Sequence, residues 1–255
     1  MYKKCPECGY ERKGDENAPD DQCPACGLIY SKWMKNRFAP PPEPEPDTFE
    51  IAESRLKEIG RTILERVIAP KPYLDPMVVY GQLILLILLI FVGVRFLSYG
   101  VDQHLFQGMD ARFLHRVNLV FHEAGHVIFR PFGEFIFILG GTLMQLIVPM
   151  VFAIYFLFWR EDSFSSSAML WWFGQNALDI APYVNDARKM ELMLLGGGTG
   201  KEVGGHDWNN LLRMTNCLKY DNTLAWIFYS AGTTLMILAI IWGGYTLLLE
   251  HKNRA

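Results

Sequence analysis

The sequence predicts an all-α protein in which several helices cross a membrane and a small polar segment precedes them. Of the 255 residues, 51% are hydrophobic, and the mean hydropathy is +0.11. Residues 1–76 are polar and charged, whereas most of the remainder, residues 77–255, is apolar. Three runs in the apolar part carry at most one charge each and are long enough to cross a hydrocarbon layer of about 30 Å. These features predict a polytopic helical bundle, integral to a membrane.

Four apolar runs are expected to cross the membrane. They are Met77–Ser98, Phe135–Trp159, Thr223–Leu249 and the more polar Ser165–Val184. A fifth segment, Val117–Phe129, lies between two arginines and is too short and too polar to face lipid. We expect the other helices to enclose it, because histidine and glutamate are costly at membrane depth.

Two cysteine pairs organise the first 37 residues. The chain has Cys5-Pro-Glu-Cys8 and Cys23-Pro-Ala-Cys26, with fourteen residues between the pairs. Four thiolates in two tight turns suit a closed tetrahedral zinc site, and residues 1–37 resemble a zinc ribbon. Two disulfides or a redox motif are the alternatives, but two similar knuckles in so short a segment favour a structural zinc ion. A segment this small needs the metal to fold, and reduced thiolates indicate the cytosol.

Residues 38–76 connect the ribbon to the apolar part. Residues 38–47 form a proline-rich acidic linker, which is expected to be extended. Residues 48–76 contain an amphipathic helix, Thr48–Ile68, and a connector with three prolines. Two placements of this helix remain open: on the membrane surface or packed against the chain's own membrane domain. The basic residues of 1–76 predict a cytoplasmic N-terminus, and the opening residues lack the apolar core of a signal peptide.

The segment Phe121–His126 contains the pattern H-E-x-x-H. On a helix, His122 and His126 lie one turn apart on one face and can hold one zinc ion. Glu123 can then act as general base toward a water molecule at the metal. A chance pattern or a hydrogen-bonded histidine pair is the alternative, but the long uncharged runs on both sides favour a second, catalytic zinc site.

A catalytic zinc ion needs a third protein ligand. Asp179 and Asp186 both follow H-E-x-x-H, share a helical face if the helix is continuous, and are candidates. His206 is a further candidate if its loop folds back over the site, although His206-Asp207 more often caps a short helix.

Roughly residues 115–190 resemble the site-2 protease family of intramembrane zinc metalloproteases, most closely in the helix that carries H-E-x-x-H. Asn176, Pro182 and Asp186 are similar to a motif whose aspartate is the third zinc ligand in that family. The resemblance therefore favours Asp186 over Asp179 as the third ligand. It also implies that the substrate path is lined by three residues: Gly141, Gln145 and Asn176.

The resemblance implies a metalloendopeptidase that hydrolyses a peptide bond of a membrane protein within or near the lipid bilayer. A non-catalytic membrane adaptor that recruits a cytosolic protein through its zinc ribbon is the main alternative, although an adaptor does not need Glu123 beside two histidines. A metal transporter is less well supported, because the intramembrane ligands form one cluster. The few basic residues of the ribbon and the net charge of −3 give no reason to expect nucleic acid.

Overall fold

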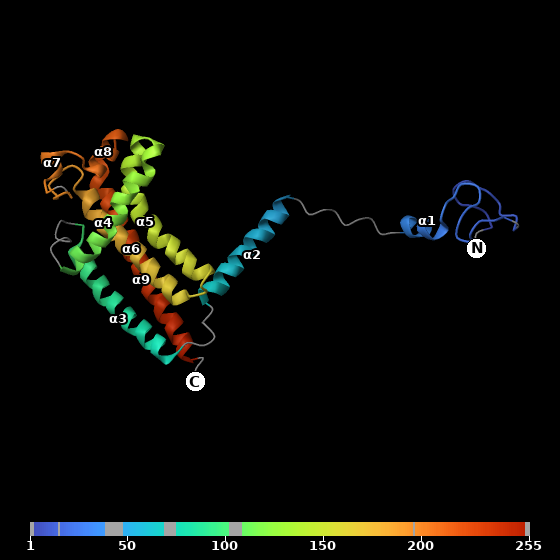
Figure 1. Ribbon diagram of the computed structural model, residues 1–255, viewed down its shortest axis with the longest axis horizontal. Coiled ribbons are helices and arrows are strands. Elements are labelled where there is room, and N and C mark those ends of the chain that lie inside the picture. The colour runs from blue at the N-terminus through green and yellow to red at the C-terminus, as the bar shows by residue number, and fades with distance from the viewer. Residues whose placement is uncertain are drawn as a thin grey trace. The chain divides into compact units, whose positions relative to one another are not determined.

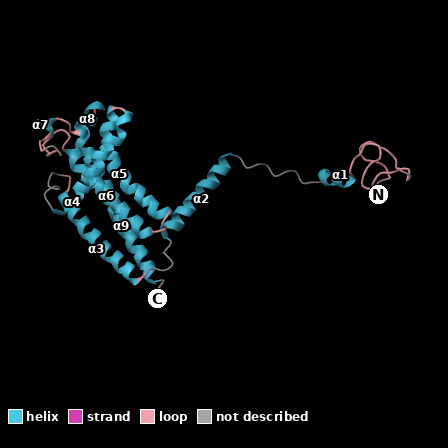
Figure 2. Cartoon of the chain, viewed as in Figure 1, coloured by secondary structure: helices cyan, strands magenta, loops and turns pink. Residues whose placement is uncertain are grey.

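The structure is a computed structural model. It describes residues 3–14, 16–38, 48–68, 75–101, 109–195 and 197–252. Two compact units are present, residues 1–57 and residues 58–255 (Figure 1). All regular secondary structure in the described ranges is helical, as the sequence predicts (Figure 2).

The first unit contains two similar knuckles followed by helix α1 (Tyr30–Arg37). Each knuckle closes with a short antiparallel backbone pairing: Cys5 N–H donates to Tyr10 O, and Cys23 N–H donates to Leu28 O, both at 2.8 Å. Tyr30, at the start of α1, is buried against the two knuckles. The predicted linker over residues 39–47 lies outside the described residues.

Helix α2 (Thr48–Ile68) has the bounds that the amphipathic pattern predicts. Its last turn is attached to the helical unit: Ser163 Oγ donates to Arg66 O at 2.7 Å, and Trp242 Nε1 donates to Val67 O at 2.9 Å. Ile59 and Ile63 remain exposed. The end of α2 therefore packs on the chain's own bundle. The apolar side chains of Ile63 and Ile59, one and two turns earlier, do not take part in this packing.

In the described part of the second unit, five long helices form the bundle (Figure 1). They are α3 (Pro76–Tyr99), α4 (Met109–Phe129), α5 (Glu134–Phe158), α6 (Ser163–Asn185) and α9 (Asp221–Lys252). Helix α6 is central and packs against α9, α5 and α3, while α4 packs mainly against α5. The core between α3, α6 and α9 contains Phe96, Trp171 and Met236, all nearly inaccessible to solvent.

Two short helices, α7 (Gly200–Val203) and α8 (Asp207–Met214), lie in the connection between α6 and α9. They sit at the end of the bundle where α4 turns into α5 through a short 3-10 helix, Arg130–Phe132 (Figure 1). Helix α8 contacts both α5 and α6. The chain between α6 and α9 is thereby held over one end of the bundle.

Among the described residues, three helices are long and apolar enough to cross a membrane, consistent with a membrane protein. They are Pro76–Tyr99, Glu134–Phe158 and Leu218–Lys252. Most of their apolar side chains are exposed in the isolated chain, as expected if lipid covers them. Helix α6, expected as a fourth span, does not meet the same criterion, and its sequence is instead largely buried by its neighbours.

Glycines set the distance between α4 and α5. A Cβ atom added to Gly125 would lie 2.1 Å from Gly140 O, which is backbone and cannot rotate away. The Gly125→Ala variant should therefore lose about 1–3 kcal/mol of stability, the usual cost of overpacking. The matched control is Gly81→Ala in α3, where nothing lies within 4 Å of an added Cβ. Thermal unfolding in detergent should separate the two variants, and equal midpoints would contradict this tight contact.

Candidate metal sites

The four cysteines of the two knuckles come together as one cluster in the first unit. The sulfur atoms of Cys5 and Cys26 lie 3.8 Å apart, and those of Cys8 and Cys23 lie 3.7 Å apart. Zinc–sulfur bonds of about 2.3 Å place the sulfurs of a tetrahedral site roughly 3.8 Å from one another. The cluster thus fits a tetrahedral metal ion.

A second cluster joins α4 to the start of α8. Asp207 Oδ2 lies 3.0 Å from His122 Nε2 and 3.3 Å from His126 Nε2. One ligand atom from each of the three residues lies within 4.8 Å of the others. Bonds of about 2.0–2.2 Å place two ligands of a tetrahedral zinc ion roughly 3.3–3.5 Å apart. The donor set of two imidazoles and one carboxylate also suits a catalytic zinc ion, which keeps one open position.

The hydrogen bonds of the two imidazoles leave Nε2 of each ring free to bind a metal. His122 Nδ1 lies 3.2 Å from the amide oxygen of Gln145, and His126 Nδ1 lies 2.9 Å from the carbonyl oxygen of Phe137. An oxygen of this kind only accepts, so Nδ1 carries the hydrogen in both rings. Both Nε2 lone pairs then face Asp207, the arrangement that metal-binding histidines commonly have.

Asp207 is the first residue of α8, and its side chain is not used as a helix cap. His206 takes that role, because its Nδ1 accepts from Asn209 N–H at 3.2 Å. Asp207 N–H donates to Tyr183 Oη at 3.0 Å, which fixes the backbone beside the histidines.

A cavity of about 1090 Å³ opens at this cluster. Glu123, His122, His126 and Asp207 all line it. Its remaining wall is largely apolar and comes from α4, α5, α6, the segment before α7 and α7 itself; it includes Leu119, Phe137, Ile138, Ile180, Leu194 and Val203. His122, His126, Asp207 and the carboxylate of Glu123 therefore share one cavity with a mainly apolar lining.

The structure does not bring Asp186 to the histidines, so the expectation that it completes the site is corrected. Asp186 ends α6, and its carboxylate accepts from Leu192 N–H at 2.8 Å and Glu191 N–H at 3.1 Å. Its Oδ2 also lies 3.4 Å from His206 Nε2. Asp186 therefore holds the loop that leads to Asp207, and His206 is occupied by this pair and by its capping role.

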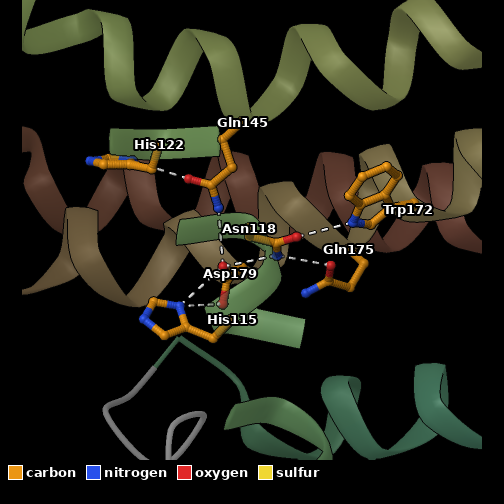
Figure 3. Close-up of polar contacts among 7 residues, drawn as sticks. All are labelled: His115, Asn118, His122, Gln145, Trp172, Gln175 and Asp179. Carbon is orange, nitrogen blue, oxygen red and sulfur yellow. Dashed lines mark hydrogen bonds and ion pairs between the residues drawn. The ribbon is translucent and has the colours of Figure 1, made fainter. Parts of the chain in front are cut away.

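Asp179, the alternative third ligand, is also directed away from the metal cluster. Its buried carboxylate accepts from Gln145 Nε2 and from Asn118 Nδ2, both at 3.0 Å, and lies 3.1 Å from His115 Nδ1 (Figure 3). It reaches His122 only through Gln145. Asp179 thus belongs to a buried polar network between α4, α5 and α6.

Of the three residues expected along a substrate path, Gln145 lines the cavity, whereas Gly141 and Asn176 do not. Gln145 lines the cavity but is bonded to His122. A Cβ atom on Gly141 would lie 2.5 Å from His122 Nε2, so this glycine makes room for the imidazole. Asn176 is buried and donates to Trp172 O within α6. Gly141 and Asn176 are not among the residues that line the cavity.

Sequence reasoning missed Asp207. The signal available was His206-Asp207-Trp208 after a glycine-rich stretch, which was interpreted as a helix cap. A helix does begin there, but His206 caps it and frees the neighbouring carboxylate.

No protein-family model, curated protein or solved structure matches this sequence. The resemblance to the site-2 protease family therefore stays a prediction based on the residues themselves.

Proposed function

We propose that this protein is an integral membrane zinc metalloprotease that hydrolyses a peptide bond of a membrane protein. One observation carries the proposal: two histidine Nε2 atoms and one carboxylate converge beside Glu123 in a single cavity. The zinc-binding residues in this proposal are His122, His126 and Asp207. The four cysteines hold a second, structural zinc ion, and the cysteine-containing unit binds a cytosolic partner or regulates the enzyme.

The chemistry follows from the groups in the cavity. His122, His126 and Asp207 would hold a zinc ion, which would supply a water molecule of lowered pKa and polarise the scissile carbonyl group. Glu123 accepts a proton from the attacking water and later delivers it to the amine of the leaving peptide. His122 and His126 are held in the tautomer that exposes Nε2, and Tyr183 fixes the backbone of Asp207.

The surroundings of the cavity support a membrane-embedded substrate. Helix α4 lies against α5, one of the three helices apolar enough to cross a membrane. The lining of the cavity is mainly apolar, so it suits an unwound stretch of a hydrophobic segment. A peptide bond must be unwound before attack, because its carbonyl group is otherwise occupied in a helix.

A cleavage assay tests the proposal directly. Purified full-length protein in detergent is incubated with a panel of synthetic transmembrane peptides, each with a fluorophore and a quencher at opposite ends. We expect cleavage that a zinc chelator abolishes and added zinc restores. If protein with both sites loaded cleaves none of the peptides, the non-catalytic adaptor replaces the protease as the better proposal.

A further inference from the structure

We infer that Asp179 and Gln145 are positioning residues that fix the tautomer of His122 and so prepare its Nε2 atom for the metal. This inference rests on the proposed metal site and deepens it. The three residues form one chain of hydrogen bonds: His122 Nδ1 to Gln145 Oε1 at 3.2 Å, and Gln145 Nε2 to Asp179 Oδ2 at 3.0 Å (Figure 3). No part of this chain is a metal ligand except His122.

Asp179 determines which group donates and which accepts in each of these hydrogen bonds. A carboxylate accepts hydrogen bonds, so the group of Gln145 that faces it is the amide NH₂. The amide oxygen then has to face the imidazole, and His122 has to donate from Nδ1. In the opposite amide orientation, Gln145 would present N–H to Nδ1 and favour hydrogen on Nε2, the atom that the metal needs.

The other neighbours of Asp179 hold the carboxylate in place. Trp172 Nε1 can only donate, and it donates to Asn118 Oδ1 at 3.0 Å, which turns the Asn118 amide NH₂ toward Asp179 and Gln175 (Figure 3). His115 Nδ1 lies within 3.2 Å of both carboxylate oxygens. The side chain of Asp179 is 1% exposed. Hydrogen-bond donors contact its carboxylate from several sides, so packing fixes its orientation.

The burial of the network explains why it can control the tautomer. Asn118 and Gln175 are completely inaccessible to solvent, and the exposed fraction of Gln145 is 5%. A wrongly oriented amide would leave buried groups unpaired at a cost of about 1–3 kcal/mol each. The hydrogen-bond partners of metal-binding histidines typically change metal affinity by about 10–100-fold when they are removed.

The test measures metal affinity and histidine tautomer in the full-length chain without substrate. Cobalt titration separates the two sites, because cysteine ligation gives intense charge-transfer bands and nitrogen–oxygen ligation gives only weak bands. We expect Gln145→Leu to weaken cobalt binding at the His122 site by about 10–100-fold. Asn176→Leu is the matched control, since this buried amide bonds only within α6.

Nitrogen-15 NMR of histidine-labelled, metal-free protein gives a readout that general destabilisation would not change. His122, assigned by its loss in His122→Gln, should carry hydrogen on Nδ1 in the wild type and shift toward the other tautomer in Gln145→Leu. Asp179→Asn should also weaken cobalt binding, because an asparagine lets the Gln145 amide reverse. In the Gln145→Leu background the same change should have little further effect.

The outcomes separate the two proposals. If the wild-type chain binds cobalt only at the cysteines, the proposed function fails, and this inference fails with it. If the wild type binds cobalt at both sites and Gln145→Leu binds as tightly with an unchanged His122 tautomer, only the positioning role is wrong. Equal effects of Asp179→Asn in both backgrounds would likewise show that Asp179 does not act through Gln145.

Discussion

Asp207→Ala should lower the metal content of the purified full-length chain from two zinc ions to one. The remaining pair of imidazoles on α4 lacks the carboxylate that neutralises part of the ion's charge and completes a three-residue donor set. Elemental analysis after gel filtration in detergent measures the ratio of zinc to protein. Peptide cleavage should disappear together with the second ion.

Two controls make the result specific. Asp186→Ala should keep both ions, because Asp186 bonds to the backbone of Glu191 and Leu192. Cys8→Ser should lose the other ion, the one held by the cysteine cluster, and keep the ion at Asp207. A chain that keeps two ions in Asp207→Ala but loses one in Asp186→Ala would reverse the assignment of the third ligand.

Glu123→Gln should lower the rate of peptide cleavage by about 10²–10⁴-fold, the range for the loss of a general base. Glutamine has nearly the same shape but cannot accept a proton from water at neutral pH. Glu123 donates no ligand atom to the cluster of His122, His126 and Asp207, so the zinc content should stay at the wild-type value. Single-turnover cleavage of the fluorescent peptide, with metal content measured on the same sample, checks both statements.

Glu134→Gln is the matched control for Glu123→Gln. Glu134 lines the same cavity from the start of α5, so the substitution removes an equal charge from the same space. Its turnover should remain near that of the wild type. If both variants slow cleavage equally, the effect of Glu123 is one of general charge in the cavity and not of proton transfer.

The sequence predicted the features whose residues are close together in the chain. The cysteine knuckles and the H-E-x-x-H pattern each depend on one or two turns of backbone, so spacing alone brings their side chains together. The bounds of Thr48–Ile68 followed from apolar periodicity, and the three most apolar helices followed from their length. These predictions needed no knowledge of how the helices pack.

The position of Asp207 beside the two histidines depends on packing and was not predicted. Asp207 is 85 residues from His122, and its approach depends on how the connection between α6 and α9 folds over the bundle. Motif order favoured Asp186, but that carboxylate accepts from backbone N–H groups of the loop that follows its helix. The role of Gln145 was missed for the same reason, since its partners lie on two other helices.

The placement of Asp207 at the first residue of α8 gives the metal a second consequence. An ion at this site would link α4 to α8, a short surface helix far away in the chain. By mass action, its binding energy would add to the stability of every conformation in which α8 is docked, and would add nothing to conformations in which α8 has detached. The order of the loop that covers the cavity would then depend on the supply of metal, so that loading the ion and closing the site become one equilibrium.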